Sequence, residues 1–271
     1  MRSSRDFELP DDFWIPIPMD TNNITAFSPF LVPQDHLGSR ATFYSMAAFM
    51  FVLFVSGTAI NILTIACTIK YKKLRSHLNY ILVNMAVANL LVSCVGSFTC
   101  FTSFTARYFI FGPTACKVEG CLATIGGMVG LWSLAVVAFE RWLVICKPLG
   151  NFIFKPNHAL ACCVFTWVCA LIAALPPLFG WSRYIPEGLQ CSCSTDWYTT
   201  NNKFNNESFV MFLFGFCFAV PLSTIIFCYG QLLITMKMFR SCIMMMLGMG
   251  GGEEDTSTSQ SVTEVSKVSP A

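Results

Sequence analysis

The sequence predicts an all-α integral membrane protein with five transmembrane helices. Apolar residues make up 55% of the 271 residues and charged residues only 12%, with a mean hydropathy of +0.60. Such a composition lies outside the range of soluble domains. The stretch Gly120–Phe139 carries no charge and is enclosed by Glu119 and Glu140. At the rise of an α-helix these two carboxylates lie about 31 Å apart, which is the thickness of a hydrocarbon layer.

Charge-poor runs of spanning length recur along the chain. They cover Phe43–Ile69, Leu78–Ala106, Leu122–Ile145, Ala159–Trp181 and Phe209–Met236. The N-terminal residues MRSSRDFELP are polar, so we expect no cleavable signal peptide and a first span that acts as its own insertion signal. Pro176, Pro177 and Pro221 interrupt spans, where we expect kinks because membrane helices tolerate proline.

The charges of the loops predict the orientation. Basic residues crowd the first and third connections, whereas acidic residues predominate before the first span. Because positive loops stay in the cytoplasm, the N-terminus should lie outside and the C-terminus inside. The predicted organisation is an extracellular tail of residues 1–42, a five-span bundle of residues 43–237 and a cytoplasmic tail of residues 238–271. Asn23 is then a glycosylation acceptor in the outer tail, and Asn206, which adjoins the fifth span, a less favourable one.

Most of the fourteen cysteines fall in or beside apolar spans, where a thiol is a small apolar side chain. Three others, Cys116, Cys191 and Cys193, fall on the oxidising outer side. A disulfide from Cys116 would pin the loop after the fourth span across the mouth of the bundle. The spacing leaves open whether its partner is Cys191 or Cys193.

The cytoplasmic tail has two parts. Residues 238–249, MFRSCIMMMLGM, are apolar but too few to cross a membrane. We expect this short amphipathic segment to lie along the inner surface, with Cys242 as an acylation site. The polar residues that follow either solvate the tail or form a phosphorylation cluster beside acidic residues. The candidate phosphorylation sites are Thr256, Ser257, Thr258, Ser259, Ser261 and Thr263.

Ionisable groups at the edge of a span by default mark function. Arg141 can reach the interface with its long side chain, whereas the short Glu119 side chain cannot, so Glu119 is the stronger candidate for a functional group. Enzyme chemistry is not indicated: the three histidines lie outside the spans, and no phosphate loop or nucleophile elbow occurs. No sequence pattern predicts a metal site or a nucleic-acid partner, and we expect membrane lipid to surround the spans.

Several segments resemble the vertebrate visual opsins, which are light-activated G-protein-coupled receptors. The similar segments are Leu78–Asn84, Phe111–Cys116 followed by Glu119-Gly120, Gly180–Gly188 and Cys228–Gln231. Met128 and the Glu140-Arg141-Trp142 form are most similar to fish short-wavelength, blue-sensitive cone opsins. The resemblance implies a rhodopsin-like helical bundle and a visual pigment apoprotein that binds 11-cis-retinal, acting in phototransduction and visual perception.

The resemblance also implies roles for individual residues. Glu119 matches the counterion of the protonated retinal Schiff base, Cys116 pairs with Cys193, and Glu140 with Arg141 forms the lock that opens to a G protein. Retinal would be contacted by Thr124, Gly127, Met128, Glu187, Cys217 and Phe218. Implied partners are a transducin-like G protein, opsin kinase and arrestin, and the implied location is the photoreceptor outer segment, addressed by residues 268–271.

The chain departs from the opsin pattern after Lys237. Met238–Cys242 follows at once and resembles the segment beyond the seventh opsin span, so the sixth and seventh spans are expected to be missing. The retinal-binding lysine is then missing too, because none of the nine lysines falls in mid-span. A variant transcript, a deletion and a faulty gene model remain open. So do two functions: a photoreceptor, or a non-photoactive isoform that pairs with intact opsin and is retained in the endoplasmic reticulum.

Overall fold

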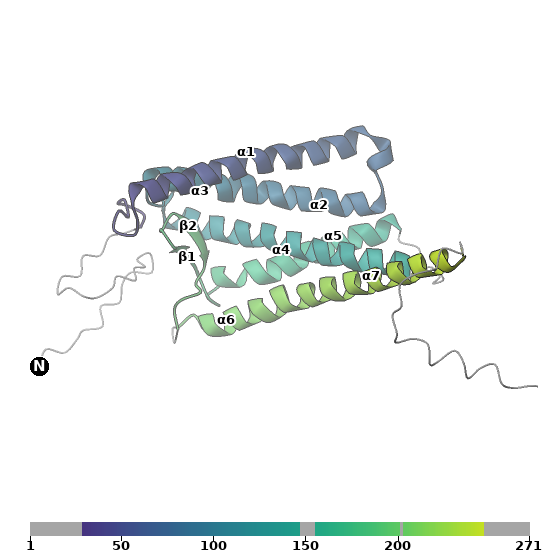
Figure 1. Cartoon of the computed structure of the whole chain (residues 1–271). Helices are drawn as coiled ribbons and strands as arrows, with labels where there is room; N and C mark the ends of the chain where they lie inside the picture. Colours follow the sequence, from purple (N-terminus) through teal and green to yellow (C-terminus); the bar gives the residue numbers. More distant parts are fainter. Residues whose placement is uncertain (1–28, 147–154, 201–202, 247–271) are drawn as a thin grey trace, which may run out of the picture.

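The computed structural model describes residues 29–146, 155–200 and 203–246. This part contains five helices long and apolar enough to cross a membrane, as predicted, and they run alongside one another in a bundle (Figure 1). The acceptor Asn23 and the candidate phosphorylation sites from Thr256 to Thr263 lie outside the described residues, as do residues 268–271.

The first two spans form one edge of the bundle. Helix α1 covers Arg40–Lys70 and begins at Ser39, whose hydroxyl accepts a hydrogen bond from the Thr42 amide at 3.2 Å. The second span contains α2 (His77–Leu91), a π-helical turn η2 (Val92–Ser97) and α3 (Phe98–Ala106). Helix α1 packs along α2, η2 and α3.

Helix α4, Gly112–Cys146, is the centre of the molecule and packs against α2, α5, α7 and a β-hairpin. It begins ten residues before the predicted Leu122. Polar residues such as Lys117 and Glu119 had limited the predicted span, but they do not break a helix, and Pro113 near its start suits the first turn. Twelve of its residues are buried, among them Glu119 and Glu140.

The fourth span ends earlier than predicted. Helix α5 covers Pro156–Ala174, and a short 3₁₀ turn, η3 (Pro176–Leu178), follows it. Two successive prolines provide no amide hydrogen for the carbonyls one turn earlier, so the α-helix cannot continue. Trp181, the expected end of this span, therefore lies in the loop that follows.

The fifth span contains α6 (Asn206–Phe212), a π-helical turn η4 (Leu213–Ala219) and α7 (Val220–Met246). The π-helical turn ends two residues before Pro221, whose ring cannot be accommodated by regular α-helical hydrogen bonding. Helix α7 continues through Met246, beyond the expected end near Lys237. The reason is local: residues 238–246 contain no glycine or proline, and methionine favours helix.

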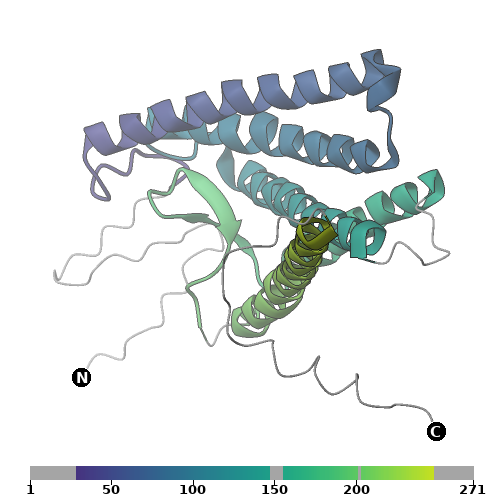
Figure 2. The same cartoon turned by 45° about the vertical axis from the view of Figure 1, so that its right-hand side comes forward.

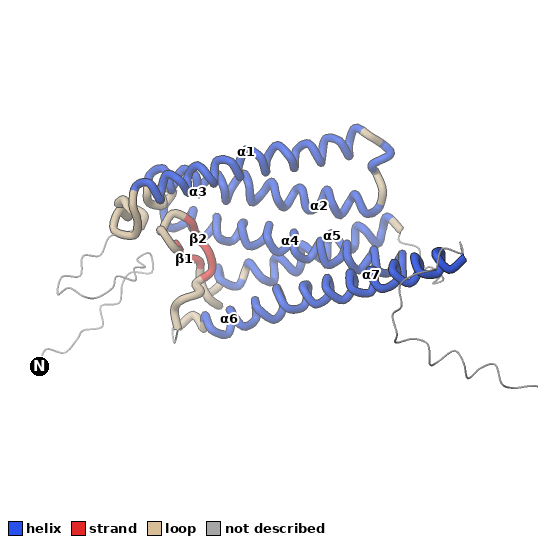
Figure 3. The backbone as a smooth tube through the Cα atoms, viewed as in Figure 1, coloured by secondary structure: helices blue, strands red, loops and turns tan. Residues whose placement is uncertain are grey.

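The loop after the fourth span folds into an antiparallel hairpin of β1 (Tyr184–Glu187) and β2 (Ser192–Thr195). Figure 3 shows the hairpin at the end of the bundle where α4 begins, which is the end predicted to be extracellular. Cys193 is paired with Pro186 in the register of the hairpin. Figure 2 shows α1 and α7 on opposite sides of α4, so the helices form an open, layered arrangement.

Candidate functional site

A disulfide joins Cys116 of α4 to Cys193 of β2, with 5.4 Å between the Cα atoms. The bond decides the choice that the spacing left open and fastens the hairpin to the central helix. Cys191 stays free and fully buried in an apolar cluster that includes Phe43 and Phe104. Burial raises the pKa of the Cys191 thiol to about 12, so the thiol is unreactive at neutral pH.

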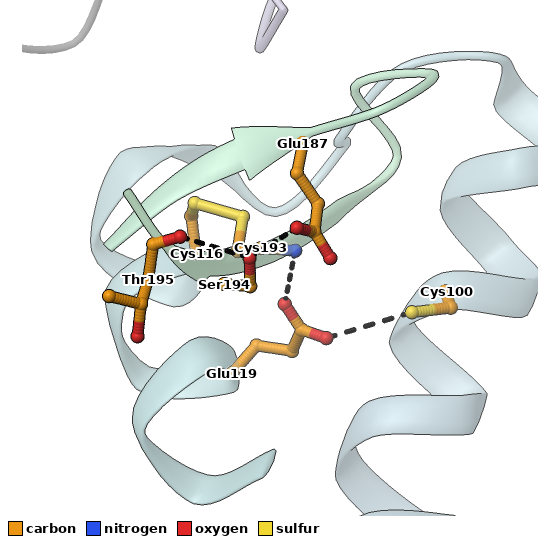
Figure 4. Close-up of a disulfide and its surroundings, with 7 residues drawn as sticks. All are labelled: Cys100, Cys116, Glu119, Glu187, Cys193, Ser194 and Thr195. Carbon is orange, nitrogen blue, oxygen red and sulfur yellow. Dashed lines mark hydrogen bonds between the residues drawn. A yellow bond between two sulfur atoms is a disulfide. The ribbon is translucent and has the colours of Figure 1, made fainter. Parts of the chain in front are cut away.

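Glu119 lies one turn after Cys116 on α4 and is 3% exposed. Its carboxylate accepts a hydrogen bond from the Cys193 amide at 2.8 Å, and the Cys100 thiol points to its other oxygen at 3.6 Å (Figure 4). In the part of the chain that the structure describes, no cation lies within ion-pair distance of Glu119. The disulfide thus holds a backbone donor against a buried carboxylate.

A second carboxylate approaches from the hairpin. Glu187 of β1 is half-buried and accepts a hydrogen bond from the hydroxyl of Ser194 on β2 (Figure 4). Ser194 follows Cys193 directly, so both carboxylates are tied to neighbouring residues of the same strand. The two acids therefore share one rigid frame at the outer end of the bundle.

Below this frame is an apolar pocket of about 540 Å³ between α4, the hairpin and the fifth span. Five residues predicted to face retinal line it: Thr124, Gly127, Met128, Cys217 and Phe218. Glu119 and Glu187 are not part of the lining but adjoin its Cys193 and Ser194. Sequence reasoning missed further lining residues: Gly120, Ala123, Leu131, Cys193, Ser194, Thr195, Trp197, Val210, Leu213 and Phe214. Spacing on α4 could have indicated Gly120, Ala123 and Leu131, whereas the hairpin and loop residues carry no such signal.

Tyr184 and Asp196 fix the hairpin beside the pocket. The Tyr184 hydroxyl donates to the Ala174 carbonyl at 2.8 Å, and its ring packs so closely on Gly120 that a Cβ there would lie 2.6 Å from it. Burial raises the pKa of Tyr184. Burial alone would also raise the pKa of Asp196, but hydrogen bonds from Thr199, from Arg183 at 3.0 Å and from the Tyr198 amide hold that pKa below its ordinary value.

At the inner end of α4, Arg141 donates two hydrogen bonds to Glu140, at 2.6 and 3.2 Å. Glu140 is 6% exposed, whereas the Arg141 side chain is 37% exposed. The guanidinium thereby neutralises a buried carboxylate and still reaches the surface. Cys242, the predicted acylation site, lies exposed on the last turns of α7.

The comparisons with known proteins agree with this arrangement. Residues 60–244 match the 7 transmembrane receptor (rhodopsin family). The chain is 74% identical to the blue-sensitive opsin of Oryzias latipes over 88% of its own length and 68% of that protein. The chain belongs to the visual opsins. Members of this family are receptors rather than enzymes.

Two further similarities define how much of an opsin is present. The blue-sensitive opsin of Carassius auratus is 72% identical over 85% of this chain and 66% of that protein, so the chain spans about two thirds of the length of these relatives. The crystal structure of squid rhodopsin superimposes with a TM-score of 0.72, at 24% identity, over 84% of this chain and 65% of that one. That likeness shows the opsin fold of the five helices.

Proposed function

We propose that this chain is the five-span part of a blue-type visual pigment apoprotein, and that it binds retinal without bonding it covalently. The observation that carries the proposal is the apolar pocket beside the buried Glu119. A volume of about 540 Å³ lies within the range of pockets for small apolar ligands.

The lining suits an apolar chain such as retinal. Thr124, Gly127 and Met128 of α4 would form one wall, and Cys217 and Phe218 of η4 the other. A Cβ at Gly127 would meet no atom within 4 Å, so this glycine leaves room for a ligand. When bound, retinal supplies the absorption of light, and the Glu119 carboxyl would lie at the outer end of the pocket, where we expect it to be protonated because it has no cation partner among the described residues.

Covalent attachment is where this chain should differ from its relatives. In the described part of the chain, the residues that line the pocket include no lysine. Lys117 of α4 is exposed and follows the disulfide residue Cys116, at the outer edge of the span. We therefore propose that the polypeptide alone lacks its own photochemistry, although its lineage is that of light sensors.

We propose that the residues at the inner end of the bundle have the roles of their counterparts in the family. The Glu140–Arg141 pair would be the contact that opens to a transducin-like G protein, and opsin kinase and arrestin would act on the tail. Delivery to the photoreceptor outer segment is the family destination. We expect retention in the endoplasmic reticulum instead, because polar side chains such as Asn89 remain exposed within the spans.

Two matched variants test the pocket. Gly127→Phe places a ring in the lining, whereas Gly130→Phe lies one turn further along α4, outside the lining, and its Cβ also meets no atom within 4 Å. Binding of 11-cis-retinal in the dark is measured by quenching of tryptophan fluorescence, since Trp197 lines the pocket. Gly127→Phe should abolish saturable quenching and Gly130→Phe should preserve it. Equal quenching by both variants would show that retinal does not occupy this pocket.

A further inference from the structure

The inner end of α7 extends past the helices that it packs against. The Thr235 hydroxyl of α7 donates to the thiol of Cys146, the last residue of α4, at 3.3 Å. All the residues that follow in the helix, from Met236 to Met246, are exposed. They add about 16 Å of helix, and Figure 1 shows this end of α7 extending past the inner end of α5. The described residues therefore leave the inner end of α7 uncovered.

A groove of about 500 Å³ runs along this uncovered end. Apolar and basic side chains of α7 line it together, among them Met236, Lys237, Phe239, Arg240, Ile243 and Met244. At helical spacing, Phe239 and Ile243 lie to one side of Arg240, and Lys237 and Met244 lie to its other side. The groove thus combines apolar walls with two cationic groups.

The two cations of the groove have no anionic partner in the part of the chain that the structure describes. Neither Lys237 nor Arg240 forms an ion pair there. Helix α7 itself carries no aspartate or glutamate, and at the inner end of α4 the Glu140 carboxylate is bonded to Arg141. An anionic occupant of the groove must therefore come from outside the described residues.

The chain carries a segment of suitable chemistry directly after α7. Residues 247–255, LGMGGGEED, contain two apolar side chains followed by three carboxylates. Measured from Met246, Lys237 lies about 14 Å back along the helix, whereas the seven residues from Met246 to Glu253 can span up to about 23 Å. The glycines between them permit the sharp turn that a return requires.

We propose that residues 247–255 fold back along α7 and occupy this groove. The carboxylates of Glu253, Glu254 and Asp255 would bind Lys237 and Arg240, and the two apolar side chains would cover the walls. Because the segment is tethered, its effective concentration at the groove exceeds that of a separate partner. The contact would hold Thr256, the first candidate phosphorylation site, close to Arg240, where a phosphate would strengthen it. The inference does not involve the retinal pocket.

Photo-crosslinking of the full chain tests the proposal. The photoreactive residue p-benzoylphenylalanine replaces either Phe239, which lines the groove, or Met238, which is similarly exposed but lies outside the lining. The chain is placed without retinal in phosphatidylcholine nanodiscs and irradiated, and the adducts are mapped by mass spectrometry. The probe at position 239 should yield adducts within residues 247–255 at least about threefold more often than the probe at position 238, because the ion pairs are exposed but tethered.

An exchange of charges separates this contact from mere proximity in the sequence. Lys237→Glu together with Arg240→Glu should lower the yield at position 239 to that at position 238. Adding Glu253→Lys and Glu254→Lys to the same chain should restore the yield, since the attraction returns with its signs exchanged. Lys72→Glu together with Lys73→Glu is the matched control on an exposed turn, and it should leave the yield unchanged.

Four outcomes would overturn the inference. Two of them are equal yields at the two probe positions and a charge exchange that fails to restore the yield. The third is a set of adducts that join isotopically labelled and unlabelled copies of the chain, which would assign the groove to a second copy. The fourth is adducts of the position-239 probe with phospholipid in place of residues 247–255, which would assign the groove to the membrane.

Discussion

Gly126 is the glycine at which α4 approaches the second span, at the junction of α2 and η2, most closely. A Cβ at this position would lie 2.2 Å from Val92 Cγ2 and 3.0 Å from the Ala88 carbonyl oxygen. Val92 is β-branched and stiff, and Ala88 contributes backbone, so neither neighbour yields cheaply. We expect Gly126→Ala to overpack this contact at a cost of about 1–3 kcal/mol. Gly127→Ala is the matched control because its Cβ meets no atom within 4 Å.

Both substitutions gain the same helix propensity, about 1 kcal/mol in favour of alanine, so their difference isolates the steric term. Melting of the detergent-solubilised protein can be followed with a thiol-reactive dye, because unfolding exposes buried free cysteines such as Cys121 and Cys169. Gly126→Ala should melt roughly 2–10 °C below Gly127→Ala. Equal melting temperatures, or a higher one for Gly126→Ala, would refute the close packing of the second span on α4.

Three further predictions concern the outer face. Cys116→Ser should lower the free energy of unfolding by about 4 kcal/mol, because the disulfide closes a long loop, and Cys191→Ser by much less; equal losses in a denaturant titration would contradict the pairing. Because the pKa of Asp196 is depressed in the folded chain, this carboxylate stabilises the fold at pH values above its ordinary pKa of about 3.9. The stabilisation is lost as the pH falls from that value through the lower pKa of the folded state. On acidification, the melting temperature of Asp196→Asn should therefore fall less than that of the native chain. An equal fall in both proteins would contradict a stabilising role for the Asp196 carboxylate. An endoglycosidase should remove one glycan, at Asn23, because Asn206 is 2% exposed and donates to the Thr199 carbonyl; a shift lost in Asn206→Gln would contradict this.

The class and the five spans could be predicted because the constraint is local: lipid requires long apolar runs, and the runs are visible in the sequence. The ends of the helices were harder to predict from the sequence. The end of α5 at Ala174 depends on two prolines whose effect in a membrane helix varies, and the continuation of α7 to Met246 depends on the absence of a breaker.

The site depended more on tertiary contacts. Positions on α4 such as Thr124 and Met128 follow a helical pattern, and their alignment with opsins indicated a common wall. The contact of Glu119 with the Cys193 amide, and the placing of Trp197 in the lining, depend on how the hairpin folds back over α4. No periodicity in the loop sequence predicts that the hairpin folds back over α4. Spacing could not choose the disulfide partner of Cys116, because Cys191 and Cys193 are equivalent by spacing; the resemblance to opsins predicted Cys193, and the structure confirms it.

The most direct test of non-covalent binding is the state of retinal bound to the full chain. The protein is incubated with 11-cis-retinal in the dark, separated from excess ligand, and denatured in acid before its absorbance is recorded. We predict saturable binding before denaturation and the spectrum of free retinal afterwards, because the described residues that line the pocket include no lysine. A covalent retinal adduct that survives acid, or a visible band that bleaches in light, would contradict it.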